Sequence, residues 1–168
     1  DEDANRLTMR IPYRNALFIC FGTNKRFRSL EFAQRLLWSE GRAILKVGII
    51  GGGRVGSSLA ASLREAGMLA GITAASERHS AQLAQQFGVP VTDNVELWQA
   101  TDVLLLTVPD RLIGMVAEEL AQSVTPAAKV VLHVSGSVGL EPLAPLTQFG
   151  AHVGSLHPLQ SFAGGNTQ

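Results

Sequence analysis

The sequence predicts an α/β fold, in which a doubly wound, mostly parallel β-sheet carries helices on both faces. From residue 45 onward, apolar runs of strand length alternate with segments of helical period, and this alternation is typical of βαβ units. The run 103–106 is apolar at every position, as expected for a strand buried on both faces. A glycine-rich stretch at 51–56 joins the first apolar run to the first helical segment. The length of 168 residues suits one such domain.

The individual elements follow from these periodicities and from the positions of glycine and proline. Strands are predicted at residues 46–50, 69–75, 89–92, 102–108, 129–134 and 151–156. Helices are predicted at residues 54–66, 77–87, 95–100, 111–124 and 140–149, the last interrupted by proline. Gly67 and Gly88 follow two of the helices and suit their C-terminal ends. Because Pro90 lacks an N–H group, the strand at 89–92 is expected near an edge of the sheet or at a strand start.

The first 44 residues differ in composition from the rest of the chain. They carry a net charge of +3, whereas residues 45–168 carry −3. A short strand at 16–21 and a helix at 29–39 fit the apolar pattern of this N-terminal extension. We interpret the extension either as a segment that packs on the main domain or on a partner, or as a poorly ordered or non-native leader. The main domain is assigned to residues 45–162, and residues 163–168 to a frayed polar tail.

Charge and composition argue against several classes of protein. Lys+Arg and Asp+Glu both number 14, so the chain lacks the basic excess of proteins that neutralise nucleic-acid phosphates. A single cysteine, Cys20, rules out an internal disulfide and a multi-cysteine zinc site. The apolar runs are shorter than the roughly 18 residues of a membrane span, and the acidic start is unlike a signal peptide. We therefore expect a soluble, cytoplasmic protein without nucleic-acid or membrane partners.

The glycine-rich stretch contains the pattern G-x-G-x-x-G at Gly51, Gly53 and Gly56. Its position between a strand and a helix makes this widespread pattern informative. Gly51 permits the tight turn, Gly53 lets a pyrophosphate approach the backbone, and Gly56 lets the helix pack close to the strand. The helix start offers N–H groups and a partial positive charge to phosphates. We therefore predict a Rossmann-like NAD(P)-binding domain, the alternative being a glycine-rich turn without a ligand. The predicted cofactor-binding residues of the loop are Gly51, Gly52, Gly53, Arg54, Val55 and Gly56.

The end of the second strand distinguishes NADP from NAD. An NAD site usually has Asp or Glu there, which binds the ribose 2′-hydroxyl. The sequence instead has Ser76 and Arg78 just after the expected strand end at residue 74 or 75, and a hydroxyl with a guanidinium suits a 2′-phosphate. This favours NADP as the cofactor. Two alternatives stay open: Glu77 becomes a ribose ligand for NAD if the strand ends later, or Ser76 only caps the next helix.

Candidate substrate-side residues follow the later strands, because ligands of such sheets bind beyond the carboxyl ends of the strands. Val108 and Pro109 are expected to form an apolar wall beside the nicotinamide ribose. The Ser135 hydroxyl is a candidate to bind the cofactor or a substrate carbonyl. His157 is the candidate proton donor, because imidazole titrates near neutrality and hydride transfer to C=O or C=N needs a proton. Alternatively, His157 only turns the chain before Pro158.

The remaining polar residues near these strands have structural explanations. Asp110 is expected to cap the helix that starts at residue 111. His133 is expected to be a hydrogen-bonded core histidine, and His152 to be structural. Because no carboxylate or cysteine stands at ligand spacing beside these histidines, no metal site is predicted.

Residues 46–162 resemble the Rossmann-like N-terminal domain of the domain-of-unknown-function 2520 family. The resemblance rests on the loop at 47–56, on TVPD at 107–110, on HVSG at 133–136 and, most specifically, on LHPLQSF at 156–162. The domain is also similar to the cofactor domains of pyrroline-5-carboxylate reductase and of the deazaflavin-dependent NADP reductases. These relatives imply a reductase with a nicotinamide cofactor. The family also implies an all-helical C-terminal domain that helps to form a homodimer and to close the active site, and this chain is expected to be a fragment without that domain.

Two functional hypotheses remain. The first is the cofactor-binding domain of an NADP-dependent oxidoreductase that acts on a small carbonyl or imine substrate. The second is a non-catalytic dinucleotide-binding module with a redox-sensing or structural role, which the lack of an evident acid–base pair favours.

Overall fold

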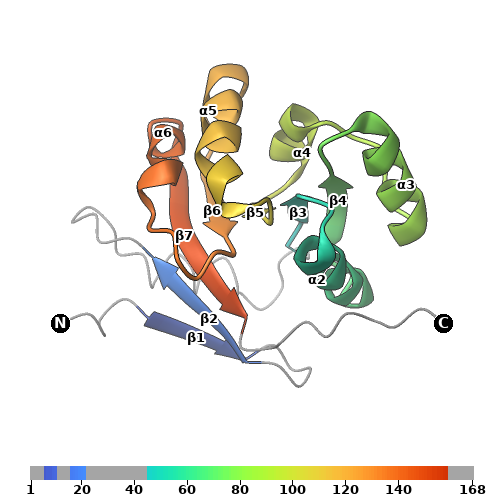
Figure 1. Ribbon diagram of the computed structural model, residues 1–168, viewed down its shortest axis with the longest axis horizontal. Coiled ribbons are helices and arrows are strands. Elements are labelled where there is room, and N and C mark those ends of the chain that lie inside the picture. The colour runs from blue at the N-terminus through green and yellow to red at the C-terminus, as the bar shows by residue number, and fades with distance from the viewer. Residues whose placement is uncertain (1–5, 11–15, 22–44, 159–168) are drawn as a thin grey trace.

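The computed structural model describes residues 6–10, 16–21 and 45–158. The predicted helix at 29–39 and the tail at 163–168 lie outside these residues. One seven-stranded sheet runs through the molecule in the order β1-β2-β7-β6-β5-β3-β4, with helices on its two faces (Figure 1). The five strands from β3 to β7 pair in parallel, which confirms the predicted doubly wound α/β fold.

The strands are β1 (Arg6–Arg10), β2 (Ala16–Phe21), β3 (Val47–Ile50), β4 (Leu69–Thr73), β5 (Val103–Leu106), β6 (Lys129–His133) and β7 (Ala151–Pro158). The helices are α2 (Arg54–Glu65), α3 (Glu77–Phe87), α4 (Asn94–Ala100), α5 (Ile113–Ser123) and α6 (Ala144–Thr147). Two 3-10 turns, η2 (Asp110–Leu112) and η3 (Glu141–Leu143), precede α5 and α6. The predicted proline interruption therefore divides 140–149 into η3 and α6, and the predicted helix at 111–124 starts with η2.

The strand predicted at 89–92 is wrong, because these residues form no strand. Gly88 ends α3 in the left-handed conformation, with φ +65°, as predicted. The Val89 N–H then donates to the Ala84 carbonyl at 3.0 Å, which is the closing hydrogen bond of a helix end. Pro90 has no N–H to offer to a neighbouring strand. This segment therefore completes α3, and β4 is left as the outer strand of the described sheet.

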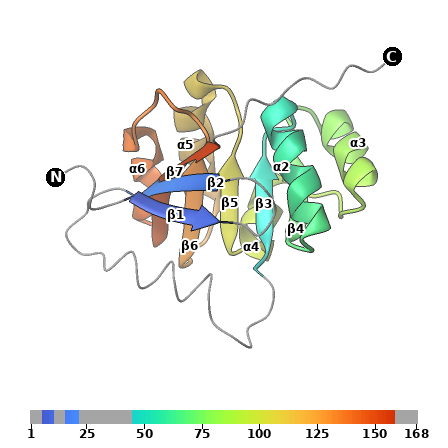
Figure 2. The ribbon, with the colours of Figure 1, turned by 90° about the horizontal axis from the view of Figure 1, so that it is seen from below.

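The N-terminal extension contributes two strands to the sheet. The strand predicted at Ala16–Phe21 is confirmed as β2, and β1 was not predicted. β2 pairs antiparallel with the second half of β7, from Gly154 to Pro158, and β1 pairs antiparallel with β2 (Figures 1 and 2). This pairing explains why β7 runs two residues beyond the predicted end at residue 156.

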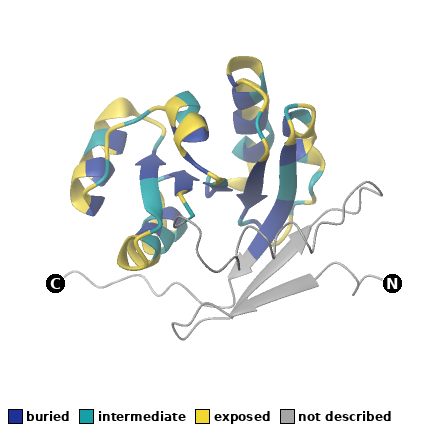
Figure 3. Ribbon diagram, turned by 180° about the vertical axis from the view of Figure 1, so that it is seen from behind, coloured by how far each residue is buried: buried dark blue, intermediate teal, exposed yellow. Residues whose placement is uncertain are grey.

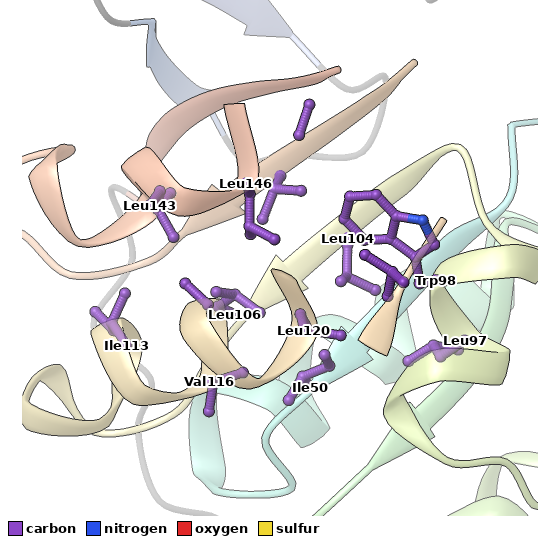
Figure 4. Packing of buried hydrophobic residues seen from close by; sticks show 14 residues of the cluster. Ile50, Leu97, Trp98, Leu104, Leu106, Ile113, Val116, Leu120, Leu143 and Leu146 are labelled. Carbon is purple, nitrogen blue, oxygen red and sulfur yellow. The ribbon is translucent and has the colours of Figure 1, made fainter. Parts of the chain in front are cut away.

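The core lies on both faces of the parallel strands. Alternate residues of β5 face opposite sides, so that Leu104 and Leu106 join one cluster and Leu105 the other. The first cluster packs under α4, α5 and α6, and Trp98 and Leu120 lie in it without exposure above 2% (Figure 4). The second packs under α2 and α3. The strands β3 to β6 are mostly buried, and the helices expose their outer sides (Figure 3), which fits the continuous apolar runs of the sequence.

In the part of the chain that the structure describes, no helix has the length and apolar character needed to span a membrane.

Candidate functional site

The glycine-rich turn joins the carboxyl end of β3 to α2 and lies against the end of β5. The Gly51 N–H donates to the Thr73 carbonyl of β4 at 2.9 Å. The buried Thr107 hydroxyl donates to the Gly51 carbonyl at 2.7 Å. Hydrogen bonds from two neighbouring strands therefore hold the first residue of the turn between the carboxyl ends of β4 and β5.

Two of the three motif glycines are required by close packing. Gly51 has φ +122°, a conformation that favours glycine, and a Cβ there would lie 2.7 Å from Thr107 atoms. A Cβ on Gly56 would lie 1.9 Å from the Gly51 carbonyl oxygen. The roles predicted for these residues, a tight turn and a close helix–strand approach, agree with this geometry.

Gly53 differs, because a Cβ added to it would meet no atom of the described residues within 4 Å. The residue is exposed, and its φ of −72° and ψ of −172° are open to any amino acid. Neither packing nor backbone conformation thus explains a glycine here. In Rossmann-like domains the second glycine of this motif lets a pyrophosphate approach the backbone.

The N-terminus of α2 has the features of an anion site. Gly53 is the N-cap residue and supplies no side-chain hydrogen bond, and the first turn contains no acidic residue. Its N–H groups from Arg54 onward therefore lack the usual side-chain acceptor, in a helix of 12 residues. Such N–H groups and the positive end of the helix dipole favour phosphate groups.

The residues predicted to select NADP lie at the start of α3. β4 ends at Thr73, earlier than predicted, so that Glu77 falls in the first turn of α3 and not at the strand end. Ser76 is the N-cap of α3 and accepts a hydrogen bond from the His79 N–H at 3.2 Å. Ser76 therefore does cap the helix, while its own hydroxyl proton is not used by this bond. Ser76 and Arg78 are both exposed.

Close packing also joins α3 to the glycine turn. A Cβ on Gly52 would lie 2.3 Å from Leu83 Cδ1 and 3.3 Å from His79 Cε1. His79, in the first turn of α3, therefore lies beside the glycine turn, and Ser76 and Arg78 belong to the same helix start. This is a tertiary contact between the glycine turn and α3, whose side-chain partners the sequence alone did not predict.

The structure adds Asn94 to the polar residues at this edge, a residue to which the sequence alone gave no role. The buried Thr73 hydroxyl, at the end of β4, donates to Asn94 Oδ1 at 2.6 Å. This leaves the Asn94 amide N–H groups available beside the β4 end.

The helix α4 begins at Asn94 with a capping box, in which Asp93 accepts from the Glu96 N–H at 2.8 Å and Glu96 accepts from the Asp93 N–H at 3.1 Å. The spacing D-x-x-E could have indicated this helix start.

The carboxyl ends of β5 and β6 carry the residues predicted on the nicotinamide side. Val108 is half-buried and Pro109 is exposed. Asp110 does not cap α5 as predicted, because neither η2 nor α5 has a side-chain cap. Its carboxylate instead accepts a hydrogen bond from the Ser137 hydroxyl of the β6–η3 loop at 2.7 Å. The residue pair is 27 positions apart, so only the tertiary structure brings it together.

Ser135 is buried and its hydroxyl belongs to the same loop. Its Oγ accepts hydrogen bonds from the N–H groups of Ser137 and Val138, both at 3.2 Å. His133, fully buried, is hydrogen-bonded as predicted: its Nε2 lies 2.9 Å from the Gly139 carbonyl, and its Nδ1 accepts from the Ser135 N–H at 3.2 Å. The described contacts of Ser135 thus organise the loop.

The two remaining histidines lie on β7. His152 is half-buried, and burial lowers the pKa of its imidazole, so that the neutral form is favoured. His157 lies near the carboxyl end of β7, where its backbone is in register with Phe18 of β2. The parallel strands thus bring the ends after β3, β5, β6 and β7 to one edge of the sheet. Within residues 6–10, 16–21 and 45–158, no three His, Cys, Asp or Glu side chains gather as a metal-binding group.

Comparisons with solved structures agree with this architecture. A pyrroline-5-carboxylate reductase from Coxiella burnetii is 23% identical with a TM-score of 0.55, over 67% of this chain and 43% of that one. An imine reductase from Myxococcus stipitatus, in complex with NAD⁺, is 18% identical with a TM-score of 0.57, over 67% and 40%. A 3-hydroxyisobutyrate dehydrogenase from Mycobacterium tuberculosis has the same four values. At these identities the likeness shows a shared fold.

The chain spans less than half of the length of these three proteins. No curated protein matches the sequence. A family model for the Rossmann-like domain matches residues 39–158, which include the glycine turn and all five parallel strands. The chain therefore belongs to the Rossmann-like domain family.

Proposed function

We propose that this chain is the NADP-binding domain of an oxidoreductase that acts on a small carbonyl or imine substrate. The observation that carries the proposal is the contrast among the motif glycines. Gly51 and Gly56 are held by packing, whereas Gly53 faces open space at the uncapped start of α2. A pyrophosphate accounts for all three glycines together, because it needs both the tight turn and an unobstructed backbone. A bare structural turn accounts only for the first two.

The chain's own residues would bind and orient the dinucleotide, which supplies or accepts a hydride when it is bound. The first-turn N–H groups of α2, with Arg54 and Val55, would hold the pyrophosphate. Val108 and Pro109 would form the apolar wall beside the nicotinamide ribose and exclude water. His157 remains the proposed proton donor to the substrate. Ser135, whose hydroxyl is engaged within its loop, would contribute by shaping the loop that faces the cofactor or substrate.

Selectivity for NADP is proposed for Ser76 and Arg78. Both are exposed at the start of α3, whose later residues Leu83 and His79 approach Gly52. The early end of β4 at Thr73 supports this proposal, because it leaves no acidic residue at the strand end, where an NAD site usually has one. The Asn94 amide is a further proposed donor at this edge, beside the ribose of the adenosine half.

The relatives support a reductase or dehydrogenase, because the similar folds include a pyrroline-5-carboxylate reductase and an imine reductase solved with NAD⁺. Since the chain covers about two-fifths of those proteins, the complete activity is part of the proposal. So are a helical C-terminal domain and a homodimer of the domain-of-unknown-function 2520 type, and a cytoplasmic location.

The decisive experiment uses Gly53→Val in a titration with NADPH. A Cβ here meets none of the residues that the structure describes within 4 Å, so the free energy of unfolding should change by only about 1 kcal/mol, the cost of a poor N-cap. NADPH affinity should fall at least about tenfold, because the side chain occupies the space of the pyrophosphate. Isothermal titration calorimetry measures the affinity, and urea unfolding measures the stability.

Gly114→Ala is the control for a glycine substitution away from the glycine turn, because a Cβ at this glycine of α5 lies in ordinary contact range, 3.7 Å from Pro142 Cβ. It should leave NADPH affinity unchanged. Failure of the native chain to bind either NADPH or NADH at millimolar concentration would reject the proposed function. Equal affinities of the native chain and Gly53→Val would reject the assigned site.

Arg78→Ala tests the choice between the two dinucleotides. Loss of the guanidinium should weaken NADPH about tenfold or more and NADH less than about twofold, because only NADPH carries the 2′-phosphate. Arg64→Ala, an exposed arginine at the end of α2, removes the same charge elsewhere and serves as the control. A native chain that prefers NADH would overturn the NADP part alone.

The non-catalytic alternative makes a separate prediction. A redox-sensing or structural module would bind the dinucleotide with the same dependence on Gly53 but would not oxidise it in the full-length protein with any carbonyl or imine substrate. NADPH oxidation by the full-length protein, followed at 340 nm, would exclude this alternative.

A further inference from the structure

Hydrogen bonds link Ser135, Ser137 and Asp110 across the carboxyl ends of β5 and β6. The function proposed above gives a role only to Ser135. The Ser137 hydroxyl donates to Asp110 Oδ2 at 2.7 Å, and Ser137 Oγ lies 3.3 Å from Ser135 Oγ. The Ser137 proton is used in its bond to Asp110, and Ser135 Oγ already accepts from two N–H groups. The Ser135 hydroxyl therefore donates its own proton to Ser137 Oγ. Both hydroxyl dipoles therefore favour a negative charge on Asp110.

The loop that carries Ser137 is held on a buried ring. The Ser135 N–H donates to His133 Nδ1, so Nδ1 is unprotonated and Nε2 donates its proton to the Gly139 carbonyl. His133 is fully buried. The ring thus ties both ends of the loop 135–139 to β6, and this loop in turn holds the Asp110 side chain in one position.

Asp110 is an ionised and exposed carboxylate. Hydrogen bonds from Ser137 and then Ser135 lower the pKa of its carboxyl group, and desolvation opposes them only in part. Its hydrogen-bond partner is a neutral hydroxyl, so the bond orients the charge without cancelling it. Asp110 directly follows Val108 and Pro109, the residues proposed to flank the nicotinamide ribose.

We propose that Asp110 is an electrostatic positioning residue that makes the site bind oxidised NADP⁺ more tightly than NADPH. The inference rests on the proposed function, and it adds a preference for one redox state of the cofactor. The nicotinamide ring carries a positive charge when oxidised and none when reduced, while the phosphates and the adenosine half are the same in both forms. A fixed carboxylate at the nicotinamide end therefore acts on the difference between them.

The preference has a consequence for the bound cofactor. Tighter binding of the oxidised form lowers the two-electron reduction potential of the bound couple, and each tenfold in the affinity ratio corresponds to about 30 mV. The site thus favours a cofactor that gives its hydride to the substrate, which is the direction expected of a reductase.

The experiment measures the dissociation constants of NADP⁺ and NADPH for the native chain and for Asp110→Asn. The amide keeps the size of the side chain and can still accept from Ser137, so the loop should stay in place. We expect NADP⁺ affinity to fall about three- to tenfold and NADPH affinity to change less than about twofold, as for one partly solvated charge pair. The native preference for NADP⁺ should also shrink between about 50 mM and about 500 mM salt.

Two further variants separate the charge from the loop structure. Ser137→Ala keeps the Asp110 charge but removes its hydrogen bond, so most of the NADP⁺ preference should remain. Glu118→Gln removes the same charge from an exposed position in the middle of α5 and should change neither affinity by more than about twofold.

Three results would overturn the inference: an equal change of both affinities in Asp110→Asn, an NADP⁺ preference that salt does not affect, or the same shift in Glu118→Gln. If the native chain binds both forms and Asp110→Asn leaves their ratio unchanged, the inference fails while the proposed function stands. If the native chain binds neither form, the proposed function fails and the inference fails with it.

Discussion

Gly56 is the motif residue at which the fold leaves the least space. The first turn of α2 lies against the preceding loop so closely that a Cβ would overlap the Gly51 carbonyl oxygen and lie 2.6 Å from Thr107 Oγ1. The same Thr107 hydroxyl donates to that carbonyl. One buried side chain thus fixes both the turn and the helix start, although the sequence analysis assigned no role to Thr107.

Gly56→Ala should therefore destabilise the protein. Because the obstructing atom belongs to the backbone, the helix must move, and overpacking of this kind costs about 1–3 kcal/mol. Urea unfolding measures the loss. Gly53→Ala is the matched control, since its Cβ has no neighbour within 4 Å in the described part of the chain, and it should leave stability within about 1 kcal/mol of the native chain. Equal stability of all three proteins would contradict the packing argument.

At the scale of the element, the start of β6 contains a buried cation at the opposite edge of the sheet from the glycine turn. Lys129 is 7% exposed. Its Nζ donates to the Thr101 carbonyl and lies 5.5 Å from the centre of the Trp98 ring. Burial lowers the pKa of the Lys129 ammonium, and the nearby Asp102 partly offsets this effect. The folded chain therefore holds this proton less tightly than the unfolded chain does.

This lowered pKa predicts a stability that increases with alkaline pH. The unfolded chain holds the Lys129 proton up to a pKa of 10.5, whereas the folded chain releases it at lower pH. Between those two values the unfolded state binds more protons, so the free energy of unfolding rises with pH. Lys129→Met should lose this rise, which urea unfolding between pH 8 and about pH 11 would detect.

Lys46→Met serves as the control for that series, because the Lys46 side chain is exposed at the same edge of the sheet. Its pH profile should follow the native one. A Lys129→Met profile parallel to the native profile would show that burial does not shift this group.

Helix ends show what local patterns predict well. α3 begins and ends at the predicted residues, because Ser76 caps its start and Gly88 adopts the left-handed conformation after its end. The adjacent error, the strand at 89–92, has a physical cause: Val89 is used to close α3 through its bond to Ala84. An apolar run after a helix does not reveal whether its N–H groups are still free for a sheet.

At the scale of the whole molecule, the apolar clusters on both faces make the parallel strands a rigid support for the loops at their carboxyl ends. Leu104 and Leu106 belong to one cluster and Leu105 to the other. Because the loops are brought together only when these strands are packed, a ligand that binds the loops binds only the folded chain. NADPH at one hundred times its dissociation constant should therefore add about 2.7 kcal/mol of stability.

That stabilisation should raise the melting temperature by about 5–10 °C for a chain of this size. Differential scanning fluorimetry with and without NADPH measures the shift, and Gly53→Val should show little of it at the same concentration. A full shift in Gly53→Val would place the cofactor elsewhere on the molecule.

The sequence by itself determined the features that depend on neighbours in the chain. The spacing of Gly51, Gly53 and Gly56 indicated the turn, alternating apolar runs indicated the parallel sheet, and Gly88 marked a helix end. These signals are local, because backbone conformation and periodicity are set within a few residues.

Only the tertiary structure decided which distant segments meet. It joined β2 to β7, Thr73 to Asn94 across 21 positions and Asp110 to Ser137 across 27. The strands β2 and β7 have no sequence feature that identifies them as partners, and neither do the two side-chain pairs. The order of the strands in the sheet determines which of these segments meet. Hydrogen bonds of this kind leave no periodic trace in a sequence, because their geometry exists only after the parallel strands have brought their carboxyl ends to one edge.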